Sequence, residues 1–242
     1  MGRIIIFGGS GGIGRAVAAR LRARNEEVVL VARDATKLAK AADDLGCQTH
    51  QADVTDPVNL GTTLAAIAAQ GAVDGLVYAV GTITVKPLGS LTPADFDRDF
   101  AVNARGAALV LQGLAGGLRA SDQAAVVLFS SVAARQGFTG HASIAMAKAA
   151  VEGLTLSLAA EWAPKVRVNC IAPSLTRTPL AASLTSNEAL AKAVAEMHAL
   201  RRLGDPEDMA GLAAFLLSSD ASWITGQVIG VDGGRSALRT KG

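Results

Sequence analysis

Short apolar runs alternate along the chain with longer segments in which apolar residues recur at helical spacing. Each run is too short for a buried helix and ends at Gly, Asp, Asn, Ser or Pro turn residues, which is typical of buried parallel strands. The seven runs are Ile4–Phe7, Val28–Val31, Cys47–Gln51, Gly75–Ala79, Ala125–Phe129, Val166–Ile171 and Gln227–Val231. Strands joined by helices in this order predict an α/β fold with a doubly wound, seven-stranded parallel sheet.

Two of the predicted helices, Asn103–Leu118 and Ser143–Trp162, carry apolar residues on almost every face. A helix that is apolar all round in a water-exposed protein must also be covered on its outer side. That cover is either a second subunit or deep burial within one subunit. We expect subunit association through these helices, and therefore a homo-oligomer.

The composition favours one domain. The chain has 242 residues, 50% of them hydrophobic, which fits a single α/β domain over residues 1–242. Its 23 Lys and Arg are scattered among 21 Asp and Glu, so no nucleic-acid-binding surface is indicated. Polar residues interrupt the longest uncharged stretch, Pro57–Val73, so no membrane span is expected.

The cysteines and the first residues of the chain indicate the cellular compartment. Cys47 and Cys170 lack a Cys-x-x-Cys spacing, which indicates buried thiols in a reducing compartment. The apolar run that ends at Phe7 is too short for a signal peptide. We therefore expect a cytoplasmic protein.

A glycine-rich turn follows the first predicted strand and leads into a helical pattern. Glycines let the backbone turn sharply and approach a pyrophosphate, whose charge is stabilised by the amides and dipole of the helix N-terminus. Strand, turn and helix occur here in the order of a dinucleotide site on a Rossmann fold. The expected cofactor contacts in this turn are Gly8, Ser10, Gly12, Ile13 and Gly14.

The spacing Gly8-x-x-x-Gly12-x-Gly14 is similar to the Thr-Gly-x-x-x-Gly-x-Gly pattern of the short-chain dehydrogenase/reductase family, with Phe replacing Thr. The segments Leu203–Asp208 and Ile224–Gly234 are very similar to the family's C-terminal signature. The resemblance therefore extends from Arg3 to about Gly234. It implies an NAD(P)-dependent oxidoreductase of small molecules that forms dimers or tetramers through helix pairs.

The end of the second strand bears on cofactor choice. Family members that bind NAD place a carboxylate there for the ribose 2′-hydroxyl, and this chain has Ala32 at that position. Arg33 follows, and its planar guanidinium suits a 2′-phosphate, so NADP is favoured. Alternatively, Arg33 only solvates the turn, and the nearby Asp34 keeps NAD open.

Three further segments resemble cofactor contacts of the family. Asp53 matches the adenine contact and Val54 a backbone contact, although Asp53 could equally be a turn residue before a helix that begins at Pro57. Gly81 matches the glycine of the family's Asn-Asn-Ala-Gly motif, whose two Asn are absent here. In a Pro-Gly-x-x-x-Thr-like segment, Pro173 and Thr178 match cofactor contacts, with Thr178 orienting the carboxamide.

The reaction site departs from the family at one position. The family spacing Tyr-x-x-x-Lys places a catalytic phenol one helical turn before the lysine, and this chain has Ile144 before Lys148. Ser131 lies thirteen residues before Ile144, the family spacing between Ser and Tyr. The resemblance implies that Ser131 donates to the substrate oxygen, that Lys148 contacts the nicotinamide ribose, and that the Asn103 backbone holds a water.

Three sources could replace the missing acid. His141 could titrate near neutrality, although an ordinary role near a helix N-terminus is favoured. A water held by Lys148, Asn103 and Ser131 needs no new residue. Tyr78 is the only tyrosine, but its position at a strand end favours core packing.

A mostly helical excursion between Leu175 and Leu203 follows the sixth strand, at the sheet edge where ligands bind in such folds. We expect it to be a lid over a substrate pocket. Its residues Leu180, Leu184 and Met197 favour an apolar substrate or else pack on the body of the protein.

The sequence has no motif for metal binding or for nucleophilic hydrolysis. His50, His141 and His198 form no metal-ligand spacing, and no Gly-x-Ser-x-Gly turn is present for hydrolysis. The leading hypothesis is an NADP(H)-dependent oxidoreductase of a carbonyl/alcohol pair with an atypical proton source. The alternatives are a dinucleotide-binding protein without redox activity, as a sensor or assembly partner, and a structural oligomer without cofactor.

Overall fold

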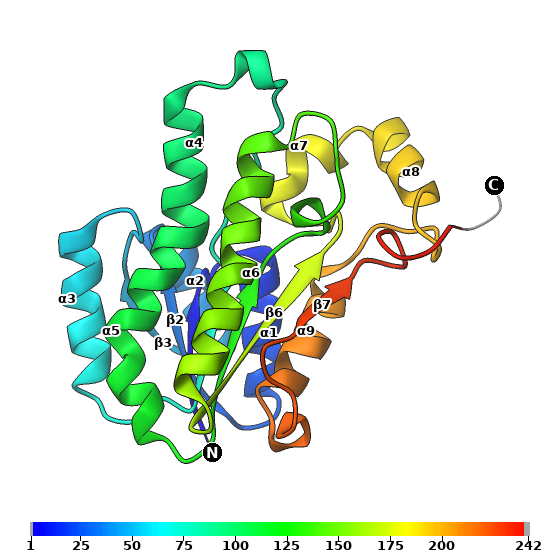
Figure 1. Cartoon of the computed structure of the whole chain (residues 1–242). Helices are drawn as coiled ribbons and strands as arrows, with labels where there is room; N and C mark the ends of the chain where they lie inside the picture. Colours follow the sequence, from blue (N-terminus) through cyan, green and yellow to red (C-terminus); the bar gives the residue numbers. More distant parts are fainter. Residues whose placement is uncertain (1, 240–242) are drawn as a thin grey trace.

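A seven-stranded parallel sheet runs through the middle of the computed structural model, which describes residues 2–239 (Figure 1). The strand order is β3-β2-β1-β4-β5-β6-β7, so the direction of winding reverses between β1 and β4. The strands are β1 (Arg3–Phe7), β2 (Glu27–Ala32), β3 (Gln48–Gln51), β4 (Gly75–Tyr78), β5 (Ala124–Phe129), β6 (Val166–Pro173) and β7 (Val228–Val231). The predicted doubly wound Rossmann fold is confirmed, and each strand lies within two residues of its predicted bounds.

The two edge strands are less buried than predicted. All four residues of β3 are exposed or half-buried, and so are those of β7, because each strand has only one neighbour in the sheet. Cys47 lies just before β3 and is half-buried, whereas Cys170 on β6 is fully buried. The prediction of a buried thiol was therefore wrong for Cys47.

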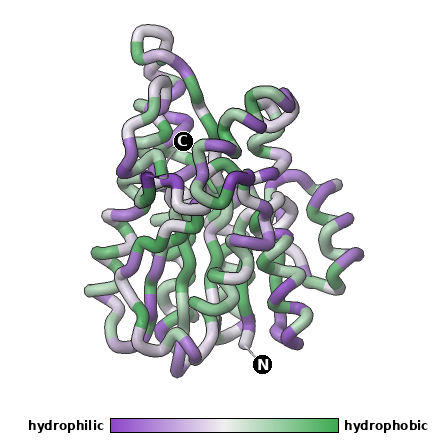
Figure 2. Tube along the Cα trace, turned by 90° about the vertical axis from the view of Figure 1, so that its right-hand side faces the viewer, coloured by the Kyte–Doolittle hydropathy of each residue, from purple (hydrophilic) through white to green (hydrophobic). Residues whose placement is uncertain are grey.

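Helices cover both faces of the sheet. One face is covered by α3 (Pro57–Ala68), α5 (Gly106–Ala120) and α6 (Ala142–Trp162), and the other by α1 (Gly12–Arg22), α2 (Ala35–Leu45) and α9 (Pro206–Leu216). Alternate strand residues feed the two cores; on β1, Ile5 and Phe7 face the first, and Ile4 and Ile6 face the second. Figure 2 shows hydrophobic positions following the strands through the centre.

One predicted helix begins earlier than expected. The segment predicted as Asn103–Leu118 belongs to a continuous helical run made of α4 (Pro93–Phe100), a π-turn (Ala101–Arg105) and α5. The Thr92 side chain begins this run by capping α4. The early apolar pattern is weak because α4 is mostly polar, so periodicity alone did not locate its start.

The carboxyl ends of the strands are overhung by short helices. A 3-10 turn (Pro179–Ala181), α7 (Ala182–Thr185) and α8 (Glu188–Glu196) lie together above the tips of β6 and β7 in Figure 1. The remaining short elements are 3-10 turns at Leu88–Ser90, Val132–Ala134 and Ser219–Ala221. The predicted excursion after β6 therefore has the helical character expected of it.

The helix α6 is long and apolar enough to cross a membrane by length and composition alone. In the structure it packs on β5 and β6, and its inner side buries the charged residues Lys148 and Glu152 together with Val151 and Trp162. This burial is that of a core helix in an α/β unit.

Candidate active site

Glycines shape the turn between β1 and α1. Gly8 has a φ of +82°, and its N–H donates to the Val31 carbonyl at 2.8 Å. A Cβ on Gly14 would collide with the Gly8 carbonyl oxygen, and a Cβ on Gly12 would lie 2.8 Å from Thr178 Cγ2. Side chains are thus excluded from a backbone cradle at the start of α1. This cradle fits the pyrophosphate of a dinucleotide.

The start of α1 is open to a ligand. Its N-cap residue, Gly11, provides no side-chain hydrogen bond to the first amides of the helix. Those N–H groups therefore remain available for an anion. Ser10 is half-buried in the same turn, and Ile13, in the first turn of α1, lines a central cavity together with Gly81 and Lys148.

The ends of β2 and β3 form an open hollow lined by charged side chains. Arg33 is exposed there beside Asp53, whose negative charge it helps to stabilise. The Asp34 carboxylate accepts from the Lys37 amide at 3.0 Å and thereby caps α2. Because Asp34 is held at a helix terminus, Arg33 is the residue of this pair whose side chain is free to meet a ribose substituent.

Asp53 forms a local turn. Its Oδ1 accepts from the Thr55 amide at 2.8 Å and from the Thr55 hydroxyl at 2.7 Å, and these bonds lower the pKa of its carboxyl. The helix cap of α3 is Asp56, and Pro57 is the first helical position as predicted. The Val54 side chain is buried in the core, which leaves its backbone for the predicted contact.

Lys148 reaches the cofactor side of the sheet from α6. Its Nζ donates to the Phe129 carbonyl at 2.9 Å, and the side chain is buried. Burial lowers the pKa of Lys148 to about 8, while the acidic groups of Cys170 and Asp99 oppose this shift. A Cβ on Gly81 would lie 3.4 Å from Nζ, so the predicted Gly81 and Lys148 do meet.

Asn103 lies in the π-turn between α4 and α5. Its Nδ2 donates to the Asp99 carbonyl at 2.8 Å and to the Thr82 hydroxyl at 2.7 Å. A Cβ on Gly81 would lie 3.1 Å from its Oδ1. The side chain thus ties the π-turn to the loop after β4, which brings Asn103, Gly81 and Lys148 to one place. Single π-turns within helices occur frequently at functional sites.

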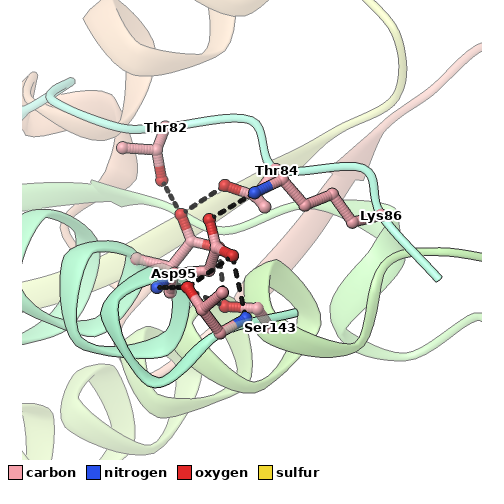
Figure 3. Close-up of polar contacts among 7 residues, drawn as sticks. Thr82, Thr84, Lys86, Asp95 and Ser143 are labelled. Carbon is pink, nitrogen blue, oxygen red and sulfur yellow. Dashed lines mark hydrogen bonds and ion pairs between the residues drawn. The ribbon is translucent and has the colours of Figure 1, made fainter. Parts of the chain in front are cut away.

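A buried carboxylate lies behind this group. Asp99 accepts hydrogen bonds from the hydroxyls of Thr82 at 2.7 Å, Thr84 at 2.8 Å and Ser143 at 2.7 Å. Figure 3 shows these contacts joining the loop after β4 to α4 and α6. Sequence reasoning missed this cluster. The one available signal was that Asp99 lies one helical turn before Asn103, on the same side of the helix.

The same loop is fixed at its outer end. Lys86 Nζ contacts Asp95 Oδ1 at 2.7 Å, and this hydrogen bond is the largest of the causes that lower the pKa of Asp95 to about 2 (Figure 3). The loop that carries Gly81 is therefore held at two points on α4.

A cavity of about 370 Å³ opens at the carboxyl ends of β4, β5 and β6. Ser131, Ile144, Lys148, Pro173 and Thr178 all line it, so the structure brings the predicted reaction residues Ser131 and Lys148 together with two predicted cofactor contacts. Ser131 Oγ accepts from the Ala133 amide at 3.1 Å, which leaves its O–H available to a substrate oxygen. Ile144 is buried and offers only a hydrocarbon surface at the position of the family phenol.

The proposed substitutes for the phenol lie in different surroundings. Tyr78 is buried in the core, stacks on Phe7 and donates to the Val102 carbonyl at 2.6 Å, so it has the structural role that was favoured. Burial also raises the pKa of its phenol. His141 lines the cavity at the N-cap of α6, with its Nδ1 2.9 Å from the Thr139 carbonyl.

The excursion after β6 closes one side of the cavity with apolar side chains. Those that line it are Leu180, Leu184, Leu190, Val194 and Met197. Thr178 caps the 3-10 turn by accepting from the Ala181 amide, which fixes where the excursion leaves the sheet.

Sequence reasoning also missed a pair formed across this excursion. His198 Nε2 lies 2.8 Å from the Ser174 hydroxyl, and Ser174 lines the cavity. The two residues are 24 positions apart, and no spacing rule connects them. Among residues 2–239, no group of three or more His, Cys, Asp or Glu side chains is placed to hold a metal ion.

Comparisons with known proteins identify the family of this chain. A family model described as enoyl-(acyl carrier protein) reductase matches residues 8–236. Dehydrogenase/reductase SDR family member 4 from Pongo abelii is 33% identical over 243 residues, covering 95% of this chain and 86% of that protein. Tropinone reductase-like 3 from Erythroxylum coca is 34% identical over 239 residues, covering 95% of this chain and 91% of that protein.

A solved structure shows the same architecture. A short-chain type dehydrogenase/reductase from Mycobacterium ulcerans superposes with a TM-score of 0.92 at 33% identity, covering 98% of this chain and 90% of that one. This chain therefore belongs to the short-chain dehydrogenase/reductase family, whose members bind NAD(P).

Proposed function

We propose that this protein is an NADP(H)-dependent oxidoreductase that interconverts a carbonyl and an alcohol, using a proton source other than tyrosine. The observation that carries the proposal is the convergence of Ser131, Lys148, Asn103 and Gly81 at one end of the central cavity. A bound nicotinamide would exchange a hydride with the substrate carbon. The residues around it bind, orient and stabilise charge.

Each residue has a defined task in this proposal. The backbone cradle at Gly8, Gly12 and Gly14 holds the pyrophosphate, and the exposed Arg33 guanidinium pairs with the 2′-phosphate. Lys148 contacts the nicotinamide ribose. Ser131 donates its hydroxyl hydrogen to the substrate oxygen, where negative charge develops as the hydride adds. Hydride transfer itself needs no further residue.

The substrate class follows from the cavity wall. Leu180, Leu184 and Met197 present hydrocarbon above the reaction residues, which favours an apolar ketone or secondary alcohol. The excursion from 175 to 203 is proposed as a lid that excludes water from this space, since it lies over the carboxyl ends of the strands.

Cofactor choice is tested by titrating the protein with NADPH and with NADH. We expect NADPH to bind at least about tenfold more tightly, because a charge-assisted contact contributes roughly 1.5–3 kcal/mol. Arg33→Ala should remove this preference, and Arg239→Ala, near the end of the described chain, serves as a control for total charge. Equal affinities in the unchanged protein would contradict the NADP assignment.

Activity is tested with a panel of apolar ketones and alcohols. We expect measurable turnover that falls at least about tenfold in Ser131→Ala and Lys148→Ala. Ser218→Ala is the matched control, because its hydroxyl donates to the Phe215 carbonyl at the far end of α9. Unchanged rates in both site variants would contradict the proposal.

A second candidate function is dinucleotide binding without redox activity, as in a sensor or assembly partner. The burial of Ile144 at the position of the family phenol favours it. It predicts NADPH binding with no oxidation or reduction of any compound in the same panel.

A further inference from the structure

Ser174 and His198 form a hydrogen-bonded couple beside the substrate cavity. His198 Nε2 lies 2.8 Å from Ser174 Oγ, and His198 Nδ1 lies 2.8 Å from the Val194 carbonyl oxygen. A carbonyl oxygen only accepts hydrogen bonds, so Nδ1 carries the hydrogen. In the neutral ring, Nε2 then accepts from the Ser174 hydroxyl. A side chain held in this way is oriented as a base toward one hydroxyl.

The couple keeps both contacts in either protonation state. When the ring is an imidazolium, Nε2–H donates to Ser174 Oγ and Nδ1–H still donates to Val194. The Ser174 hydroxyl hydrogen is then free to turn toward the cavity. Proton transfer therefore requires only rotation of one hydroxyl and no movement of the ring.

Ser174 separates two cavities of different character. On one side it lines the substrate cavity with Ser131 and Ile144. On the other side, Ser174 and the buried His198 line a second cavity of about 110 Å³, whose wall includes the charged residues Arg202, Asp208 and Asp232. A cavity of this size with charged groups on its wall can hold water. Water in the second cavity would supply protons to His198 by a route separate from the substrate cavity.

Asp232 places a carboxylate on the wall of the second cavity, together with His198. Its carboxylate interacts electrostatically with the ring, and it is held in place by the amides of Gly234 at 2.9 Å and Ser236 at 3.0 Å. The ring lies close to the backbone here, because a Cβ on Gly233 would be 3.5 Å from His198 Cδ2. A buried imidazolium therefore has an anionic neighbour.

We propose that Ser174 and His198 form the proton relay that takes the place of the absent phenol. This inference rests on the proposed oxidoreductase function. In reduction, the carbonyl carbon gains a hydride from the reduced nicotinamide, and the carbonyl oxygen takes the Ser174 hydroxyl proton. Ser174 Oγ takes the Nε2 proton of His198, and the neutral ring is reprotonated from the second cavity. In alcohol oxidation each transfer runs in reverse.

In this relay, two residues act on the substrate oxygen from different strands. Ser131 stabilises its negative charge from the end of β5, while Ser174 delivers the proton from the end of β6. Ile144 can then be a hydrocarbon without loss of the reaction, because the proton no longer arrives through α6.

The relay is tested with Ser174→Ala and His198→Gln, measured as single-turnover rates with NADPH and a ketone substrate found in the panel. We expect each variant to lose at least about a hundredfold in rate, in line with the usual contribution of general acid catalysis. The affinity for NADPH should stay within about threefold. The double variant should be no slower than the slower single variant, because the two residues act as one unit.

Matched controls separate this effect from damage to the fold. Ser218→Ala and His50→Gln remove a hydroxyl and an imidazole away from the cavity, and both should retain the rate of the unchanged protein. A phenol at position 144 supplies a rescue. Adding Ile144→Tyr to the Ser174→Ala variant should restore the reaction rate, whereas adding Ile144→Phe, which lacks the hydroxyl, should not.

A spectroscopic readout does not depend on turnover. The ¹⁵N shifts of the His198 ring should report hydrogen on Nδ1, and the Nε2 shift should change in Ser174→Ala while Nδ1 remains protonated. Hydrogen on Nε2 in the neutral ring, or a rate in Ser174→Ala equal to that of the unchanged protein, would overturn the relay alone. Binding of NADPH without turnover in the unchanged protein and in Ile144→Tyr would overturn the proposed oxidoreductase function as well.

Discussion

Lys148 holds its ammonium group in a buried position with one hydrogen bond, to the Phe129 carbonyl at 2.9 Å. Sequence resemblance assigned this lysine to the cofactor ribose, but its electrostatic state depends on contacts that no motif describes. Burial lowers its pKa to about 8, and Asp99, anchored by three hydroxyls, opposes that shift. The Lys148 ammonium therefore loses its proton at a lower pH than an exposed lysine does.

This shift predicts a pH-dependent stability difference for Lys148→Met. Below pH 8 the ammonium is charged in both folded and unfolded chains, and its burial costs on the order of 3 kcal/mol. Between about pH 8 and 10.5 the unfolded chain binds the proton more tightly, so stability increases with pH until the cost vanishes. At pH 7 the free energy of unfolding of Lys148→Met should thus be about 2 kcal/mol higher than that of the unchanged protein. This figure allows for the hydrogen bond that the substitution removes.

The measurement is urea unfolding of the apoprotein at pH 7, 8.5 and 10. The advantage of Lys148→Met over the unchanged protein should shrink across this series. Lys37→Met, at an exposed position in α2, is the control and should show no such trend. A difference that is constant with pH would contradict the lowered pKa of Lys148.

At the scale of elements, the π-turn decides the geometry of the site. The run from α4 through Ala101–Arg105 to α5 places Asn103 against Gly81, and Tyr78 supports it from the core by donating to the Val102 carbonyl at 2.6 Å. Gly106 leaves room for this contact, because a Cβ there would collide with the Tyr78 hydroxyl oxygen. The only tyrosine of the chain thus holds the π-turn in place and takes no part in the cavity.

Tyr78→Phe should therefore weaken both the fold and the site. The Val102 carbonyl would lose its phenol donor in a buried position, at a cost of about 1–3 kcal/mol in the free energy of unfolding. Urea unfolding measures this loss, and NADPH titration measures the effect on the site. Phe215→Leu, in α9 on the opposite face, controls for a change of core volume. Unchanged stability in Tyr78→Phe would contradict the supporting role.

At the scale of the whole molecule, large apolar side chains are exposed where α4 and α6 lie side by side. Phe100 is 52% exposed and Met146 is 63% exposed, and both line a shallow hollow of about 710 Å³ between these helices. Leu156, further along α6, is 54% exposed. The outward apolar residues predicted for the second helix are thus present, since Met146 and Leu156 are uncovered within one subunit, whereas 103–118 exposes no large hydrophobic residue. Large apolar residues exposed together in this way favour association.

We therefore expect a homo-oligomer that Phe100→Glu dissociates, because burying an unpaired carboxylate in an apolar interface is strongly unfavourable. Light scattering during size-exclusion chromatography should show a larger mass for the unchanged protein than for Phe100→Glu. Val58→Glu is the control, since Val58 is 80% exposed on α3 and does not line this hollow. Identical masses for Phe100→Glu and the unchanged oligomer would place the interface elsewhere.

The sequence by itself determined the strands, the doubly wound character of the sheet and the glycine turn after β1. These depend on local patterns: apolar runs of strand length, turn residues at their ends, and glycines such as Gly8 and Gly14 where a Cβ has no room. It also located Ser131, Lys148 and Ile144 in one site, because their spacing along β5 and α6 matches a known family.

Only the tertiary structure decided the contacts between segments far apart in the chain. The pairing of Ser174 with His198, the three hydroxyls on Asp99 and the support of the π-turn by Tyr78 all join residues from different elements. No periodicity predicts such contacts, since they arise from the packing of loops and helices over the sheet. The lowered pKa of Lys148 has the same origin, because burial is a property of the assembled fold.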